Sequence, residues 1–122
     1  MHALVVDDSR TIRRIIGDMM RTLGFEVSEA GDGVEALERL AEIETPDILL
    51  VDWNMPRMNG IDFIRTVRAD IKYSDVAIMM VTTETEMERM AEAFVAGANE
   101  YVMKPFDKAT IADKLHILGV GV

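Results

Sequence analysis

Short apolar runs alternate with helical apolar stripes five times along this chain, and this alternation limits the possible folds more than any other feature. Residues 3–6, 48–51 and 101–103 are the clearest apolar runs, and each is followed by a charged residue. Short apolar runs bounded by turn signals are typical of fully buried strands in a parallel sheet. Strands that alternate with helices through right-handed crossovers place the helices on both faces of such a sheet. The sequence therefore predicts an α/β fold, a doubly wound five-stranded parallel sheet with five helices.

The expected elements follow one another without a linker or a repeat, so we predict a single domain over residues 1–122 with no output domain. Strands are expected at residues 3–6, 25–30, 48–52, 76–81 and 100–103. Helices are expected after each strand, the first with a stripe from Ile12 through Ile15 to Leu23 and the fourth with Met87, Met90, Ala91 and Phe94 inward. Gly24 is expected to end the first helix, and Asp107 to cap the last one.

Charge and composition exclude several classes of protein. The chain has 22 acidic and 13 basic residues, a net charge of −9, which argues against a nucleic-acid partner. It has no cysteine, no signal peptide and no apolar stretch of the ~20 residues that cross a bilayer. We therefore expect a cytoplasmic, monomeric protein without a membrane segment.

Charged residues lie at the carboxyl ends of three of the predicted strands. Asp7 and Asp8 follow the first strand, Asp52 ends the third, and Lys104 follows the fifth. The carboxyl ends of parallel strands meet in one crevice, where ligands bind. Three carboxylates that close repel one another unless a cation joins them, and an all-oxygen site suits Mg²⁺. A carboxylate nucleophile beside a lysine then predicts a site that accepts a phosphoryl group, with Thr82 as a hydrogen-bond donor.

The motifs in this chain resemble those of the receiver domain of bacterial response regulators, and the resemblance covers essentially all of it. Within that family the pattern is most similar to single-domain chemotaxis regulators of the CheY type, whose flavodoxin-like sheet has the strand order 2-1-3-4-5. The residues that carry the resemblance are Val5-Val6-Asp7-Asp8-Ser9, Asp52-Trp53-Asn54-Met55-Pro56, Met58-Asn59-Gly60, Val81-Thr82, Gly97-Ala98, Tyr101-Val102 and Lys104-Pro105-Phe106.

The resemblance implies a role for each residue around the predicted metal. Asp52 matches the phosphoacceptor, which also binds the metal, and Asp7 and Asp8 match the other metal-binding acids. Asn54 matches the position whose backbone carbonyl binds Mg²⁺. Trp53, next to the phosphoacceptor, is expected to be half-exposed.

The resemblance also implies how a phosphoryl group would be sensed and lost. Thr82 matches a switch hydroxyl, Tyr101 an aromatic side chain that repacks with it, and Lys104 a phosphoryl-binding lysine before a cis proline. The fourth helix, fifth strand and fifth helix are the expected target surface. The side chains of Asn54 and Glu84 match positions that influence attack by water, and they predict a short-lived phosphoryl group.

The resemblance implies a phosphorylation-activated switch in a two-component system, with chemotaxis as the leading interpretation. A histidine kinase would donate the phosphoryl group, and a flagellar motor switch protein or another protein would be the target, with a phosphatase as a further partner. Self-phosphorylation and autodephosphorylation would depend on Mg²⁺, without turnover of an external substrate. The alternative within signalling is a phosphorelay intermediate or phosphate sink that binds a phosphotransfer protein through residues 11–14.

Two other classes fit the sequence less well. A metal-dependent phosphatase would need a second acid near its nucleophile, and Asn54 occupies that position. A flavin-binding module would need a phosphate loop after the first strand, where Asp7 and Asp8 would repel a phosphate.

Overall fold

The computed structural model describes residues 1–121, and its centre is one parallel sheet in the order β2-β1-β3-β4-β5. This confirms the predicted fold class and strand order. The strands are short and pair in parallel throughout. Their bounds are His2–Val6 for β1, Glu26–Ala30 for β2, Ile48–Asp52 for β3, Ala77–Thr82 for β4 and Glu100–Met103 for β5.

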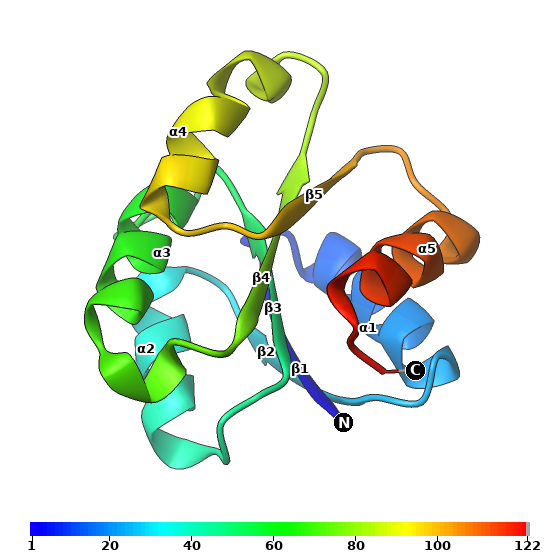
Figure 1. The fold of residues 1–122 in the computed structure, drawn as a ribbon, viewed down its shortest axis with the longest axis horizontal. Helices are drawn as coiled ribbons and strands as arrows, with labels where there is room; N and C mark the ends of the chain where they lie inside the picture. Colours follow the sequence, from blue (N-terminus) through cyan, green and yellow to red (C-terminus); the bar gives the residue numbers. More distant parts are fainter. Residues whose placement is uncertain (122) are drawn as a thin grey trace.

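Helices cover both faces of the sheet. Figure 1 shows α1 and α5 on one face and α2, α3 and α4 on the other. The bounds are Arg10–Thr22 for α1, Gly33–Glu42 for α2, Gly60–Ala69 for α3, Met90–Ala96 for α4 and Lys108–Leu118 for α5, with short 3₁₀ helices η1 at Ile71–Tyr73 and η2 at Glu86–Arg89. Among the residues described, no helix is long and apolar enough to cross a membrane.

The apolar strand runs form two cores because successive side chains in a strand point to opposite faces. Leu4 and Val6 of β1 pack with Leu49 of β3 in the core beneath α2, α3 and α4. Ala3 and Val5 lie in the second core, beneath α1 and α5. This burial on both faces explains why β1 and β3 are apolar along their whole length rather than at alternate positions.

Polar side chains fix where the helices begin. Ser9, Asp32, Asn59 and Asp107 each accept a hydrogen bond from a backbone N–H in the first turn of α1, α2, α3 and α5 respectively. The predicted cap at Asp107 is therefore confirmed. Gly24 follows α1 with a φ of 97°, which confirms the predicted glycine stop.

Arg68 ties the end of α3 to the segments that precede β4 and β5. Its guanidinium donates to the carbonyl oxygens of Tyr73 at 2.9 Å and Gly97 at 3.0 Å, and to Asn99 Oδ1 at 2.8 Å. Burial lowers the pKa of Arg68. A single side chain thus satisfies polar groups of two separate segments, the end of η1 and the loop between α4 and β5.

Two predicted apolar stripes differ from the structure. In the fourth helix Met90, Ala93 and Ala96 are buried, whereas Ala91 and Phe94 face outward. The helix begins as the 3₁₀ segment η2, which has about 3.0 residues per turn, so a stripe extended from Met87 at 3.6 residues per turn selects the wrong face. In the first helix Ile15 is 46% exposed, beside a surface groove.

Candidate functional site

The sheet register brings the predicted site residues together at one edge. Val6 of β1 pairs with Val51 of β3, so Asp7 and Asp52 follow on neighbouring strands. The Lys104 backbone N–H donates to the carbonyl oxygen of Thr82 at 2.7 Å, which places β5 beside β4 at the same edge. The prediction that these residues converge beyond the carboxyl ends of the strands is therefore correct.

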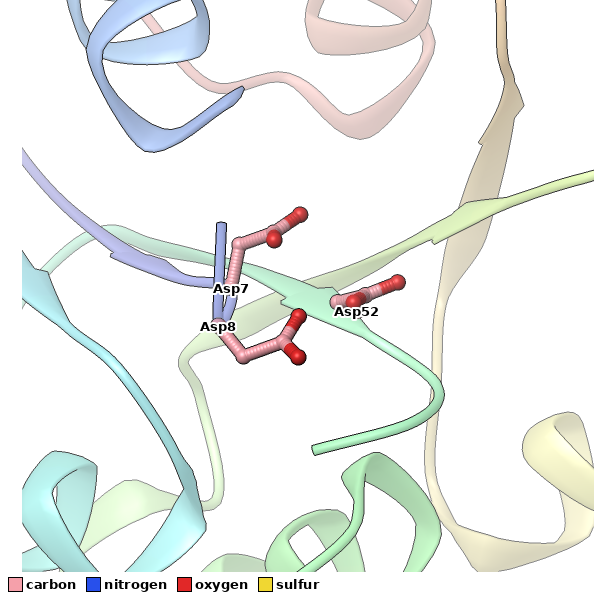
Figure 2. A group of neighbouring side chains, drawn as sticks. All are labelled: Asp7, Asp8 and Asp52. Carbon is pink, nitrogen blue, oxygen red and sulfur yellow. The ribbon is translucent and has the colours of Figure 1, made fainter. Parts of the chain in front are cut away.

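Three carboxylates form the centre of the site, as Figure 2 shows for Asp7, Asp8 and Asp52. One carboxylate oxygen from each lies within 4.8 Å of the others. Asp7 is 1% exposed and Asp52 is 8% exposed, while Asp8 lies at the open side. We call this cluster of two buried carboxylates and one exposed carboxylate the acidic pocket.

Lys104 is the cation that faces two of these acids. Its Nζ lies 3.4 Å from Asp7 Oδ2 and 3.6 Å from Asp52 Oδ1. Asp7 also accepts a hydrogen bond from the backbone N–H of Ser9 at 2.8 Å, which fixes its carboxylate at the start of α1. The Lys104–Pro105 peptide bond is cis, as the resemblance implied.

The single positive charge of Lys104 does not neutralise the three carboxylates, and the pKa values of Asp7 and Asp52 are raised. Burial, and then the charge of Asp7, raise the pKa of Asp52 to about 6, although Lys104 opposes the rise. Burial also raises the pKa of Asp7, against the Ser9 N–H and Lys104. The site therefore holds more negative charge than its protein surroundings stabilise.

A bound divalent cation would compensate this excess of negative charge. Mg²⁺ binds carboxylate and carbonyl oxygens and keeps several waters, which suits a pocket with one exposed carboxylate. The carboxylates of Asp7, Asp8 and Asp52 supply hard oxygen donors, and no sulfur ligand is available because the chain has no cysteine. The backbone carbonyl of Asn54, two residues after β3, was the fourth ligand predicted from the resemblance.

The loop after β3 is held close to the site by Gly60 and Arg57. A methyl group on Gly60 would collide with the carbonyl oxygen of Asp52, so only glycine allows α3 to begin here. Arg57 has a φ of 63°, a conformation that side chains other than glycine rarely adopt. Its guanidinium binds Asp32 at 2.9 and 3.2 Å and so anchors the loop to the start of α2.

The predicted switch residues lie on β4 and β5, and among residues 1–121 no hydrogen bond joins their side chains to Asp7, Asp8 or Asp52. Thr82 is fully buried at the end of β4, and its hydroxyl donates to the carbonyl oxygen of Thr83 at 3.2 Å. Tyr101 is half-buried on β5 and packs against the core beneath α4. The Nζ of Lys114 lies 4.3 Å from the centroid of the Tyr101 ring, on its α5 side. In the sheet, Thr82 pairs with Met103, two residues after Tyr101 on the neighbouring strand β5.

Two residues, Asn54 and Glu84, were predicted to influence attack by water, and their hydrogen-bonding surroundings differ. Asn54 Nδ2 donates to Glu86 Oε2 at 2.9 Å. Glu84 is exposed, and among the residues described no hydrogen bond reaches its carboxylate. The acid that contacts Asn54 is therefore Glu86, which the sequence analysis did not select. Its signal was the pattern Thr83-x-x-Glu86, a capping box.

Trp53 is not half-exposed as predicted but 2% exposed. It packs in the core beneath α3 and α4, and the guanidinium carbon of Arg89 lies 5.0 Å from its ring centroid. Its Nε1 is buried without a hydrogen-bond partner among residues 1–121. The expectation failed because Trp53 follows the last residue of β3, where the strand period no longer indicates which way a side chain points.

Comparison with known proteins places this arrangement among receivers. Residues 3–116 match the response regulator receiver domain family. The chemotaxis protein CheY homolog of Campylobacter jejuni is 46% identical over 99% of this chain and 95% of that protein. Chemotaxis protein CheY1 of Helicobacter pylori is 44% identical over 97% of this chain and 96% of that protein. Chemotaxis protein CheY4 of Vibrio cholerae has a similar structure, with a TM-score of 0.88 and 36% identity over 96% of this chain and 97% of that one.

Proposed function

Because the chain belongs to the response regulator receiver domain family, we propose that Asp52 accepts a phosphoryl group from a histidine kinase and switches this protein on. The observation that carries the proposal is the convergence of three carboxylates and Lys104 in one pocket. A carboxylate with a pKa of about 6 is mostly ionised at neutral pH, so Asp52 is available as a nucleophile.

We propose that the three carboxylates and the Asn54 carbonyl hold Mg²⁺. Bound Mg²⁺ supplies positive charge that screens the oxygens of an incoming phosphoryl group. An oxygen of Asp52 forms a bond to phosphorus while the bond from phosphorus to the imidazole nitrogen of the donor breaks. Lys104, already within 3.6 Å of Asp52, moves its ammonium to a phosphoryl oxygen.

The switch would follow from the position of Thr82. Phosphorylation adds roughly −1.5 to −2 charge by analogy with other phosphorylated residues, and the donors that would respond to it are the buried Thr82 hydroxyl at the end of β4 and Lys104 directly after β5. Movement of Thr82 leaves space toward which Tyr101 repacks. The surface of α4, β5 and α5 then changes, and it carries exposed apolar side chains: Phe94, Val95, Met103 and Ile117.

We propose chemotaxis as the pathway, with a flagellar motor switch protein as the target. The names of the relatives support this choice, because the Campylobacter and Helicobacter proteins are chemotaxis proteins matched over at least 95% of their own length. A cytoplasmic location and a monomeric state belong to the same proposal.

A phosphorelay intermediate or phosphate sink is the second candidate, and one observation favours it. A groove of about 360 Å³ beside the pocket is lined by Ile12, Ile15 and Ile16 of α1 and by the Lys104–Phe106 segment. An apolar groove next to the nucleophile suits docking of the helix that carries a phosphohistidine. Of residues 11–14, which were predicted to bind a phosphotransfer protein, Ile12 lines this groove.

Incubation with a small acyl phosphate donor and Mg²⁺, followed by intact-mass measurement, tests the phosphoacceptor. The wild-type protein is expected to gain the mass of one phosphoryl group, and Asp52→Asn none. An equal gain in Asp52→Asn would contradict the assignment. Glu88→Gln, an exposed acid on η2, serves as the charge-matched control and should be modified like the wild type.

Capture of partners from a lysate, with and without Mg²⁺ and beryllofluoride, separates the two candidates. Beryllofluoride stands in for the phosphoryl group on Asp52. Retention of a flagellar switch protein only in the activated state supports the chemotaxis function. Retention of phosphotransfer proteins alone supports the relay or sink.

A further inference from the structure

Glu86 occupies an unusual position because its carboxylate joins the two loops that flank the pocket. Oε1 accepts hydrogen bonds from the backbone N–H of Thr83 at 3.0 Å and from its hydroxyl at 3.1 Å. The Glu86 N–H in turn lies 3.4 Å from the Thr83 hydroxyl oxygen. This reciprocal Thr83–Glu86 pairing has the spacing of a capping box, and it holds the Glu86 side chain at the first residue of η2.

The second oxygen of the same carboxylate reaches across to the β3–α3 loop. Oε2 accepts a hydrogen bond from Asn54 Nδ2 at 2.9 Å, over 32 positions of sequence. Asn54 lies two residues after Asp52, and Thr83 directly follows Thr82. Glu86 therefore connects the loop that follows Asp52 in the sequence to the loop that follows the predicted switch residue Thr82.

This contact determines the orientation of the Asn54 amide. An ionised carboxylate only accepts hydrogen bonds, so Asn54 must turn its NH₂ group toward Glu86. Its Oδ1 then lies on the opposite side of the planar amide, free to accept a hydrogen bond from a water molecule. Without Glu86 the amide could rotate and present either group to that water.

We propose that Glu86 is a positioning residue that sets the lifetime of the phosphoryl group by orienting Asn54. The inference rests on the proposed phosphorylation of Asp52. In hydrolysis, the oxygen of a water molecule bonds to phosphorus and the bond from phosphorus to the Asp52 oxygen breaks. The Asp52 carboxylate is regenerated, and the protons of the water leave with inorganic phosphate and solvent. Asn54 Oδ1 holds the water by one of its protons while it attacks.

The experiment compares the first-order loss of the phosphoryl group in five proteins. These are the wild type, Glu86→Ala, Asn54→Ala, the double variant, and Glu88→Ala as a control on the same 3₁₀ helix. Each is loaded with a small acyl phosphate donor and Mg²⁺, freed of donor, and followed by intact mass. Circular dichroism checks that every variant is folded.

Loss of amide orientation is expected to slow hydrolysis in Glu86→Ala by about threefold or more. Because Glu86 acts through Asn54, the same substitution in the Asn54→Ala background should leave the rate unchanged. Glu88→Ala should decay like the wild type. Unchanged or faster decay in Glu86→Ala, or equal slowing in both backgrounds, would overturn the inference.

A second variant covers the case in which Glu86→Ala does not fold. Glu86→Gln has one acceptor oxygen, so it can satisfy Asn54 or Thr83 but not both, and its decay rate should lie between those of the wild type and Asn54→Ala. A rate equal to that of the wild type would overturn the inference. If the wild type gains no phosphoryl group at all, the proposed function fails as well, which separates the two failures.

Discussion

Asp52→Asn should make the protein more stable at neutral pH in the absence of a divalent cation. Asp52 is 8% exposed, and burial and the charge of Asp7 raise its pKa to about 6 from 3.8. Asparagine has nearly the same shape as the protonated acid but cannot ionise. The substitution therefore removes an unfavourable charge while it keeps the packing at the end of β3.

The size and pH dependence of this gain follow from the two pKa values of Asp52. One pKa unit corresponds to about 1.4 kcal/mol, so the difference between 3.8 and about 6 corresponds to at most about 3 kcal/mol. The folded state binds the proton more tightly, so the free energy of unfolding of the wild type falls as the pH rises from about 4 to about 6. We expect Asp52→Asn to gain about 1 to 3 kcal/mol at neutral pH and nothing below about pH 4.

Urea unfolding followed by far-UV circular dichroism, at neutral and at acidic pH with a chelator present, measures this difference. Addition of Mg²⁺ should stabilise the wild type and narrow the gap, because the cation binds the folded state. Asp113→Asn, an exposed acid on α5, is the control and should change stability by about 0.5 kcal/mol or less. Equal stability of Asp52→Asn and wild type at both pH values would refute the inference that the ionised Asp52 carboxylate destabilises the folded state.

Three further substitutions test the pocket and its support. Asp8→Ala, at the exposed acid, should weaken Mg²⁺ binding measured by titration calorimetry about tenfold or more, with little change in metal-free stability. Lys104→Met leaves two buried carboxylates without their cation and should lower the free energy of unfolding by about 1 to 3 kcal/mol at neutral pH. Arg68→Ala leaves buried carbonyl groups unpaired and should cost about 2 to 4 kcal/mol, whereas the exposed Arg65→Ala should cost about 0.5 kcal/mol or less. Unchanged Mg²⁺ affinity of Asp8→Ala would contradict its role as a metal ligand. Wild-type stability of Lys104→Met would contradict the role of its ion pairs, and wild-type stability of Arg68→Ala would contradict the role of its hydrogen bonds.

The residues at the strand ends were predictable because two local signals coincide there. An apolar run that stops at Asp7, Asp52 or Lys104 indicates both a buried strand and the place where it ends. Parallel topology then brings these ends to one edge without further information. The strand order itself came from the family resemblance, since the alternation of elements allows more than one order.

Features that depend on the path of loops were not predictable in the same way. The contact of Glu86 with Asn54 joins residues 32 positions apart, and no periodic pattern connects them. The inward face of α4 was missed because a 3₁₀ turn shifts its phase, and the burial of Trp53 because it lies just beyond a strand. The Thr83-x-x-Glu86 spacing is a local signal for the contact between these two residues, but it carries no signal for the contact with Asn54.

The Arg89–Trp53 stack gives the chain an intrinsic optical probe of its own switch. Trp53 is the single tryptophan in the sequence, so all indole emission comes from the residue next to Asp52. Arg89 belongs to η2, the start of the helix beyond Thr82, while Trp53 belongs to the loop after β3. Any movement of η2 away from β3 would withdraw the Arg89 guanidinium from the face of the Trp53 ring. The fluorescence emission of Trp53 would then report that movement without an added label.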